Sequence, residues 1–472
     1  MPLYQPDVLV PYGAPFRQET VDDQRGFEIK DEFDRLSAIM DLAPPTTTRM
    51  NQEPRARPSA PAAGSEVQTT ERSTAHRPTI FSSFWMGGFE SACHINRMQQ
   101  RLDMLAATQH DRFAEADYAR LRQVGITSVR DTVRWHLVER RAGTYDFSSF
   151  EPMFEAARRQ RMQVIWDLCH YGWPDGLDIF APAFIDRFAQ FCTAVASYVR
   201  EQSDDVPLYT PMNEISFFCW AAGEVAWFHP FGHRRGVELK RQLVRATIAG
   251  IEAIWAVDPR ARIITVEPMI HVVPPKGEPD VNGVAAAYRN SQFEAWDMLS
   301  GAMSPELGGN PRYLDVIGVN FYHDNQWEQP GGKKIAWHIH PRDPRWLPFH
   351  KLFKEVYDRY RRPIFVAETS HVGVGRAEWL REMAEELCLA IDAGVPVEGV
   401  CLYPIIDRFE WEDPSHWHNS GLWDFERDEQ GNYIRVLNDE YAAELWHSQL
   451  KLAQKGYGSH PPFALESAES AQ

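Results

Sequence analysis

Short apolar runs alternate with longer amphipathic stretches from Phe81 to about residue 450. The apolar runs are rich in Val, Ile, Phe and Tyr, which is typical of buried strands. They predict strands at residues 81–88, 127–135, 162–170, 207–214, 262–269, 313–323, 363–370 and 399–406. Between them, stretches such as 183–202 and 240–257 place apolar residues at helical spacing. Strands that alternate with helices in this way predict a parallel sheet with helical crossovers.

Eight such strand–helix units in one continuous run predict a single α/β domain, a (β/α)8 TIM barrel, over residues 79–455. The competing arrangement, a doubly wound sheet, usually carries a Gly-rich phosphate loop after its first strand. The segment GGFESA (87–92) lacks the GxGxxG spacing of that loop. The barrel is therefore the favoured fold.

Both ends of the chain lack this alternation. Residues 1–78 are rich in Pro, Ala, Ser and Thr and offer little to bury, so we expect a mostly disordered extension there. Within it, residues 25–42 have apolar positions at helical spacing and predict at most a marginal helix. Residues 456–472 are expected to form a flexible C-terminal tail.

Composition narrows the class of protein. Of the 472 residues 44% are hydrophobic, which is ample for a large core, and the net charge of −17 disfavours nucleic acid or an anionic membrane as a partner. No apolar run is long enough to span a membrane, and the first residues lack the pattern of a signal peptide. The six cysteines are scattered without a CxxC motif, which favours reduced thiols and a cytoplasmic location.

Acidic residues follow several predicted strands at the end where barrel enzymes place their chemistry. Glu214 ends the fourth strand directly after Asn213, and Glu368 follows the apolar run IFVA of the seventh. Glu267 ends the fifth strand in TVEP and is a rival candidate. Two carboxylates facing each other across a barrel mouth can cleave a glycosidic bond, one as acid and the other as nucleophile or base.

Strands four and seven lie roughly across a barrel from each other. Glu214 and Glu368 are therefore expected to approach to about 5 Å, the separation of a retaining mechanism. The amide of Asn213, beside the acid, is placed to bind a sugar 2-hydroxyl. No metal and no cofactor are required for this chemistry.

At these residues the segment from about 81 to 450 resembles the retaining β-glucosidases of glycoside hydrolase family 1. TPMNEI (210–215) is similar to the family's T-x-N-E-P, and AETS (367–370) to its T-E-N-G. The resemblance implies that Glu214 is the acid/base, with Asn213 beside it, and that Glu368 is the nucleophile. Arg130 in SVRDTVRW and Tyr322 in GVNFY match the family residues that contact the nucleophile.

The resemblance also extends to sugar-binding positions. HYGWP (170–174) is similar to H-W-D-L-P and DRFEW (407–411) to D-N-F-E-W, while FWMGGFESACHINR (84–97) aligns with F-L-W-G-A-A-T-S-A-Y-Q-I-E-G. The resemblance thus implies that His170 lies near the glycone hydroxyls. It implies substrate contacts from six residues: His94, His170, Asn320, Tyr403, Glu410 and Trp411.

Several positions depart from the family pattern. His94 stands where a sugar-binding glutamine is expected, Tyr403 where a tryptophan is usual, and Ile215 where proline follows the acid/base. Thr369 and Ser370 replace Asn-Gly. The sequence therefore indicates the type of bond cleaved, a β-glycosidic bond, more clearly than the identity of the sugar. The chain is expected to be a divergent member of the family.

The implied activity is hydrolysis of a small-molecule or oligosaccharide β-glycoside through a covalent glycosyl-enzyme intermediate. Three alternatives stay open. A transglycosidase would use the same carboxylates, and a non-catalytic sugar-binding barrel would keep the fold without the reaction. A metal-dependent hydrolase would use histidines near the strand ends, namely His94, His170, His271, His323 and His371.

Overall fold

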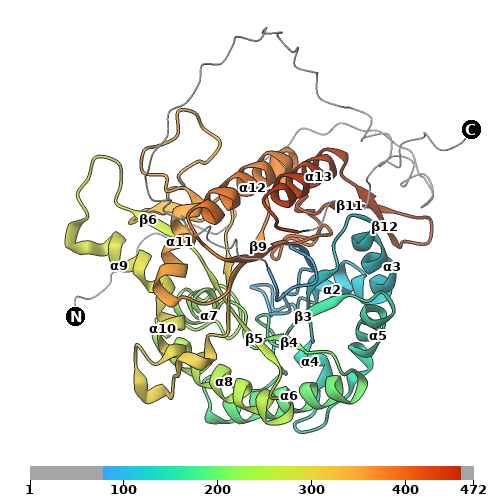
Figure 1. Cartoon of the computed structure of the whole chain (residues 1–472). Coiled ribbons are helices and arrows are strands. Elements are labelled where there is room, and N and C mark those ends of the chain that lie inside the picture. The colour runs from blue at the N-terminus through green and yellow to red at the C-terminus, as the bar shows by residue number, and fades with distance from the viewer. Residues whose placement is uncertain (1–77, 459–472) are drawn as a thin grey trace, which may run out of the picture. The chain divides into compact units, whose positions relative to one another are not determined.

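The computed structural model describes residues 78–458. Within them, eight parallel strands close into a barrel in the order β1-β10-β9-β7-β5-β4-β3-β2, and helices surround it (Figure 1). The predicted (β/α)8 barrel is confirmed. The expectations for residues 1–77 and for the tail beyond residue 458 lie outside the described residues.

Each predicted strand is present, but most are shorter than the apolar runs suggest. Strand β4 ends at Thr210 rather than Glu214. The barrel strands are β1 (Trp85–Gly88), β2 (Ser128–Thr132), β3 (Gln163–Asp167), β4 (Leu208–Thr210), β5 (Arg262–Pro268), β7 (Val316–Asn320), β9 (Ile364–Thr369) and β10 (Val397–Leu402). Two small sheets lie outside the barrel: β6 (His271–Val273) with β8 (Gln326–Glu328), and β11 (Trp423–Arg427) with β12 (Tyr433–Leu437).

The longer helices connect successive strands and cover the barrel. The two helices expected from apolar spacing are α6 (Pro182–Gln202) and α8 (Gly236–Val257). The others are α3 (His110–Gln123), α5 (Glu151–Arg159), α10 (Glu294–Ser300), α11 (Phe349–Tyr360), α12 (Arg376–Asp392) and α13 (Asp439–Gln454). Four short helices lie at strand ends or in loops: α2 (Met104–Ala107), α4 (Trp135–Val138), α7 (Ile215–Phe218) and α9 (Val284–Asn290). Among the described residues no helix has both the length and the apolar content needed to cross a membrane.

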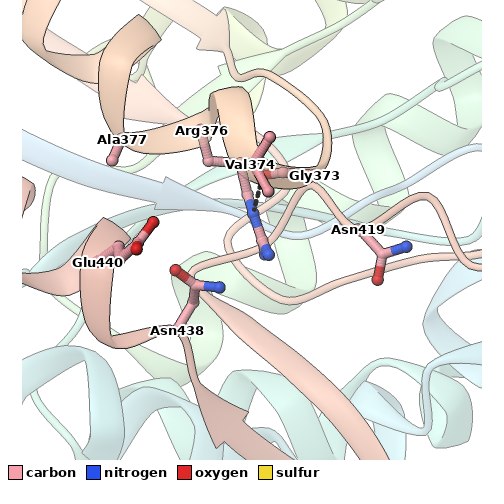
Figure 2. A pocket seen from close by; sticks show the side chains of 7 residues that line it. All are labelled: Gly373, Val374, Arg376, Ala377, Asn419, Asn438 and Glu440. Atoms are coloured by element: carbon pink, nitrogen blue, oxygen red, sulfur yellow. Dashed lines mark hydrogen bonds between the residues drawn. The ribbon is translucent and has the colours of Figure 1, made fainter. Parts of the chain in front are cut away.

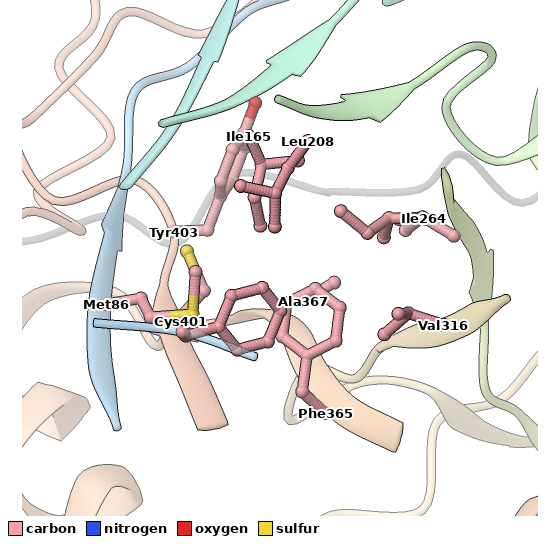
Figure 3. Close-up of a cluster of buried hydrophobic side chains, with 11 residues drawn as sticks. Met86, Ile165, Leu208, Ile264, Val316, Phe365, Ala367, Cys401 and Tyr403 are labelled. Carbon is pink, nitrogen blue, oxygen red and sulfur yellow. The ribbon is translucent and has the colours of Figure 1, made fainter. Parts of the chain in front are cut away.

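Side chains from the strands fill the interior of the barrel, so it is a packed core rather than a pore (Figure 3). The strand residues of this cluster are Met86, Ile165, Leu208, Ile264, Val266, Val316, Phe365, Ala367 and Cys401. Phe81, which precedes β1, joins the cluster with its ring centroid 4.8 Å from that of Phe365. Tyr403 completes the cluster, and it requires glycine at position 88 because a Cβ there would lie 2.1 Å from its ring.

A buried polar network joins helix α3 to strand β2. The ring of His110 stacks on Phe89 with a centroid distance of 3.6 Å. Its Nδ1 lies 2.9 Å from Asp117 and its Nε2 lies 2.9 Å from Asp131. Burial alone would lower the pKa of His110, but the two carboxylates outweigh burial and raise it. Because Asp131 follows Arg130 directly, the network also fixes the strand that carries this arginine.

We expect His110→Leu to lower the free energy of unfolding by about 3–5 kcal/mol, because it removes the ring that lies between two buried carboxylates and leaves Asp131 with Tyr118 and Asp117 with Arg435. A raised pKa in the folded state stabilises the protein fully below the unfolded pKa of about 6.5. That stabilisation is lost as the pH rises through the folded pKa. Urea unfolding across this pH range is the measurement, and the exposed His340→Leu is the control. Equal pH dependence in wild type and His110→Leu would contradict the assignment.

Candidate active site

Glu214 lies beyond strand β4, at the residue that precedes helix α7. Its backbone has a φ of 43°, a left-handed conformation that is unusual for a non-glycine residue. Two hydrogen bonds fix this turn: Asn213 N donates to Cys169 O at 3.0 Å and Glu214 N donates to Val266 O at 3.0 Å. The backbone of Cys169, just after strand β3, and that of Val266, on strand β5, therefore hold the Asn–Glu pair in place. Strained backbone of this kind concentrates at functional sites.

Glu368 lies near the end of strand β9 and is buried, with 4% of its surface exposed. Arg130 donates to one carboxylate oxygen at 2.8 Å, and the Tyr322 hydroxyl donates to the other at 2.7 Å. Asn320, at the end of β7, is in register beside Glu368. Both oxygens of Glu368 thus accept hydrogen bonds from donors, as an anionic carboxylate does.

Arg130 joins three strands of the barrel and the turn that follows a fourth. Besides Glu368, its guanidinium donates to the Ala367 carbonyl at 3.0 Å, to Asp167 at 2.7 Å and to Asn213 at 3.0 Å. The side chain is completely buried. Burial opposes its charge, but Asp167 and Glu368 outweigh this effect and raise the pKa of Arg130 well above its usual value. The charge therefore holds the ends of β2, β3 and β9 and the turn after β4 together.

A chain of hydrogen bonds runs from Asp167 to Glu214. His170 Nδ1 lies 3.1 Å from Asp167, and its Nε2 lies 3.2 Å from the amide nitrogen of Asn213. The same amide nitrogen donates to the Tyr171 hydroxyl at 2.9 Å, and Tyr171 donates to Glu214 Oε2. The five side chains form one continuous network within the described structure.

The two candidate carboxylates have unequal surroundings. Burial, followed by the negative charge of Glu368, raises the pKa of Glu214 to about 8, although the hydrogen bond from Tyr171 acts in the opposite direction. Glu368 instead faces the positive charge of Arg130. A pair in which one carboxyl has a raised pKa and the other contacts an arginine is the arrangement used for acid and nucleophile in glycosidic cleavage.

Glu267, the rival carboxylate, has a different environment. Its side chain accepts a hydrogen bond of 2.9 Å from Ser216 N, in the first turn of helix α7. Burial raises its pKa to about 7, while the hydrogen bonds from Ser216 lower it. Glu267 thus binds the turn that follows Glu214 rather than forming a pair with Arg130.

The residues expected to bind sugar fall into two groups. His94 is 1% exposed and packs against Phe228 and Trp411, with ring centroids 4.4 and 4.8 Å away. In the described part of the chain, no partner accepts from or donates to either ring nitrogen of His94, or accepts from the indole nitrogen of Trp411. Burial lowers the pKa of His94 to about 3, so the ring is neutral. These polar atoms are buried without internal partners, on rings that lie near Tyr171.

The second group consists of Tyr403, which is hydrogen-bonded within the protein, and Glu410, which is partly exposed. The Tyr403 hydroxyl accepts a hydrogen bond from Ser91 N at 3.0 Å, and its ring is parallel to that of His170 at 6.0 Å. Tyr403 therefore packs beside His170 at the end of the barrel. The Glu410 side chain is 40% exposed and lies 3.6 Å from His418.

The structure adds two features that the sequence analysis missed. Tyr171, in contact with Glu214, occupies the position of the tryptophan in H-W-D-L-P, so the change from HW to HY was the available signal. Glu90 and Arg408 form an ion pair of 3.0 Å with both side chains largely buried. The family pattern has threonine at the position of Glu90 and asparagine at the position of Arg408.

The histidines near the strand ends do not form a ligand set. Across residues 78–458 no group of three or more His, Cys, Asp or Glu side chains has an arrangement suited to a metal ion. His170 is engaged by Asp167 and Asn213, and His271 lies 3.1 Å from Arg345 O and accepts from Arg289. The rings of His323 and His371 have centroids 3.9 Å apart and are tilted by 39°.

A separate cavity of ≈ 220 Å³ lies near the start of helix α12 (Figure 2). Its lining contains none of the candidate catalytic residues and consists of Gly373, Val374, Arg376, Ala377, Asn419, Asn438 and Glu440. Arg376 donates to Asp424 and to the carbonyls of Gly373 and Gly421. The arginine is thus engaged by the protein, and the cavity is independent of the carboxylate pair.

The fold is similar to that of solved glycosidase barrels. A family 1 β-glucosidase from Thermotoga maritima has a TM-score of 0.60 at 14% identity, covering 73% of this chain and 86% of that chain. The AHE enzyme from Alicyclobacillus herbarius has a TM-score of 0.60 at 15% identity, covering 74% and 87%. The Thermotoga maritima β-glucosidase in complex with glucoimidazole gives 0.60 at 15% identity, covering 74% and 88%. No protein-family model and no curated protein sequence matches the chain.

We expect Arg130→Lys to lower the free energy of unfolding by about 3–5 kcal/mol, because one ammonium group cannot replace a planar fork that serves Glu368, Asp167 and Asn213 together. Urea unfolding is the measurement. Arg262→Lys is the control, because Arg262 pairs with Asp315 at 2.7 and 2.9 Å but both side chains are partly exposed. Its expected cost is about 0–1 kcal/mol. Equal losses in the two variants would contradict the role given to Arg130.

Proposed function

We propose that this protein is a retaining β-glycosidase, β-glucosidase-like and a divergent relative of glycoside hydrolase family 1. The observation that carries the proposal is the unequal pair of carboxylates at one end of the barrel. Glu368 contacts Arg130 and Tyr322, while burial and the charge of Glu368 favour the protonated form of Glu214. The similarity of the barrel to β-glucosidase structures supports the same reaction class.

The proposed reaction has two steps. Glu368 attacks the anomeric carbon through an oxocarbenium-like transition state, and Glu214 gives its proton to the leaving oxygen. Glu214 then removes a proton from the incoming water, which releases the sugar from Glu368 and restores both carboxyl groups. The hydroxyl of Tyr322 and the guanidinium of Arg130 orient the nucleophile. No metal or cofactor takes part.

The sugar is proposed to lie against His94 and Trp411. Their ring nitrogens are buried polar atoms without internal partners in the described structure, and hydroxyl groups of a bound sugar would supply partners. Glu410 and Asn320 are proposed as further contacts at the rim and beside Glu368. The substrate is therefore a small-molecule or oligosaccharide β-glycoside. The six free, buried cysteines support a cytoplasmic location.

Glu214→Gln and Glu368→Gln are each expected to lower kcat/KM for nitrophenyl β-glycosides by at least about 10²–10⁴-fold. The panel consists of glucoside, galactoside, fucoside, mannoside and xyloside, assayed by nitrophenol release. Glu214→Gln should lose less activity on dinitrophenyl glycosides, because their departure needs little help from an acid. Proton NMR of the first wild-type product should show the β-anomer.

Glu267→Gln is the matched control for these variants. The amide oxygen of glutamine can still accept the hydrogen bond from Ser216, so the turn at helix α7 is preserved. Its kcat/KM should stay within about threefold of wild type, well below the loss expected for an acid or a nucleophile. Near wild-type hydrolysis by both Glu214→Gln and Glu368→Gln would refute the assignment, and an α-anomer as first product would refute retention.

The pH profile should report the protonation of Glu214. As general acid, Glu214 must be protonated, and its pKa is raised to about 8. We therefore expect kcat/KM to fall as the pH rises through about 8. In Glu214→Gln the remaining activity on a dinitrophenyl glycoside should lack this basic limb. A basic limb that persists unchanged in the variant would assign it to a different group.

A further inference from the structure

We infer that Tyr171 takes the place of the substrate's 2-hydroxyl as the partner of Asn213, so that the enzyme does not depend on that hydroxyl. The inference rests on the proposed function and concerns its substrate class. It predicts that glycosides with and without a 2-hydroxyl are used about equally well. Four observations support it.

The side-chain amide of Asn213 is fully used within the protein. Its nitrogen contacts the Tyr171 hydroxyl at 2.9 Å and His170 Nε2 at 3.2 Å, which accounts for both N–H groups. Its oxygen accepts from Arg130 at 3.0 Å. An amide has two donors and one carbonyl oxygen, so Asn213 has no N–H to offer a sugar.

His170 is equally engaged. Its Nδ1 donates to Asp167 at 3.1 Å, which leaves Nε2 as the acceptor for Asn213. Neither ring nitrogen can therefore donate to a hydroxyl of the substrate without breaking this network. The two residues that the family resemblance assigns to the sugar on this side are thus both occupied.

A hydroxyl suits the position between Asn213 and Glu214, because the group there must both accept and donate. The oxygen of Tyr171 accepts from Asn213 while its proton is donated to Glu214. The tryptophan of the family pattern has an N–H donor and no acceptor, so it could not accept from Asn213. The phenol oxygen thus supplies both functions of a sugar hydroxyl, acceptor and donor.

The backbone and the surrounding rings fix Tyr171 in place. Its φ is 66°, and the next residue must be glycine because a Cβ at Gly172 would lie 2.5 Å from the carbonyl of Cys93. The ring is 1% exposed and packs against Phe217, Phe218 and Phe228 with centroid distances of 5.4, 5.5 and 5.7 Å. The phenol of Tyr171 is therefore held in this position by its backbone and by the surrounding rings, and a bound sugar would not displace it.

Hydrogen bonds to the 2-hydroxyl ordinarily strengthen in the transition state of glycoside cleavage and contribute several kcal/mol. That contribution corresponds to a rate ratio of about 100-fold or more between a glycoside and its 2-deoxy analogue. With Asn213 occupied by Tyr171, this chain lacks one of the donors that would produce the difference. Binding must then depend on the opposite side of the sugar, near His94 and Trp411.

The test compares dinitrophenyl β-glucoside with its 2-deoxy analogue, each rate divided by its spontaneous hydrolysis rate. We expect wild-type kcat/KM values that agree within about threefold, against about 100-fold if the 2-hydroxyl is used. Tyr171→Phe keeps the ring and frees one N–H of Asn213, so it should raise the preference for the 2-hydroxy substrate by about tenfold. Both substrates carry the same leaving group, so their ratio cancels any general change in acid catalysis by Glu214.

Binding provides a measurement that does not require turnover. The inhibitors isofagomine and noeuromycin differ by one hydroxyl, at the position of the sugar 2-hydroxyl. Calorimetry should give affinities of wild type for the two inhibitors that agree within about threefold. Only Tyr171→Phe should bind noeuromycin more tightly than isofagomine. Tyr209→Phe is the matched control, because Tyr209 is also completely buried but lies on strand β4 away from this network. It should leave both ratios unchanged.

The outcomes separate the inference from the proposed function. Absence of hydrolysis of both glycosides by wild type would refute the proposed function, and the two inhibitor affinities would still report on the 2-hydroxyl. A wild-type preference of about 100-fold for the 2-hydroxy compound would overturn the inference. Failure of both inhibitors to bind would also overturn the inference. The same holds if Tyr171→Phe has the same substrate and inhibitor ratios as wild type. If Tyr171→Phe does not fold, the wild-type ratios decide.

Discussion

The structure of the site depends on one buried positive charge. An isolated guanidinium in a protein interior is strongly unfavourable, and Arg130 is tolerated because its two terminal nitrogens donate to Glu368, Asp167, Asn213 and a carbonyl. Those partners come from β3, β9 and the turn after β4, so the ion network also closes the end of the barrel. The same contacts that make the arginine compatible with burial give Glu368 its ionic partner and fix Asn213 beside Glu214. Stability and candidate chemistry are coupled through a single side chain.

Polarity differs between the two ends of the barrel. Towards the start of the strands the interior is apolar, from Phe81 to Phe365. Towards their ends it becomes a hydrogen-bonded network in which each member orients the next, from Asp167 through His170 and Asn213 to Tyr171 and Glu214. The network is held in a low-dielectric environment, which strengthens each contact and disfavours a second negative charge near Glu368. Burial of Glu214, followed by the negative charge of Glu368, is the physical origin of its raised pKa.

Much of the fold could be predicted from the sequence, because a buried parallel strand has a simple apolar pattern. All eight strands were predicted, and so were the positions of Glu214 and Glu368 near strand ends. The end of β4 was wrong by four residues, because the apolar run LYTPM continues through a turn whose backbone is held by Cys169 and Val266. The role of Tyr171 could not be predicted, since it depends on a positive φ and on a close approach of Gly172 to Cys93. No periodicity in the sequence reports either feature.

The Glu90–Arg408 ion pair has a consequence for how this chain diverged. Its two members lie 318 positions apart in the sequence, yet they meet in a largely buried contact. An arginine placed there alone would be an uncompensated charge, and a glutamate alone would be another, so neither change is tolerated readily without its partner. The two substitutions are thus expected to be inherited together. A glutamate in GGFES and an arginine in DRFEW form a two-position signature by which sibling proteins could be recognised in genomes.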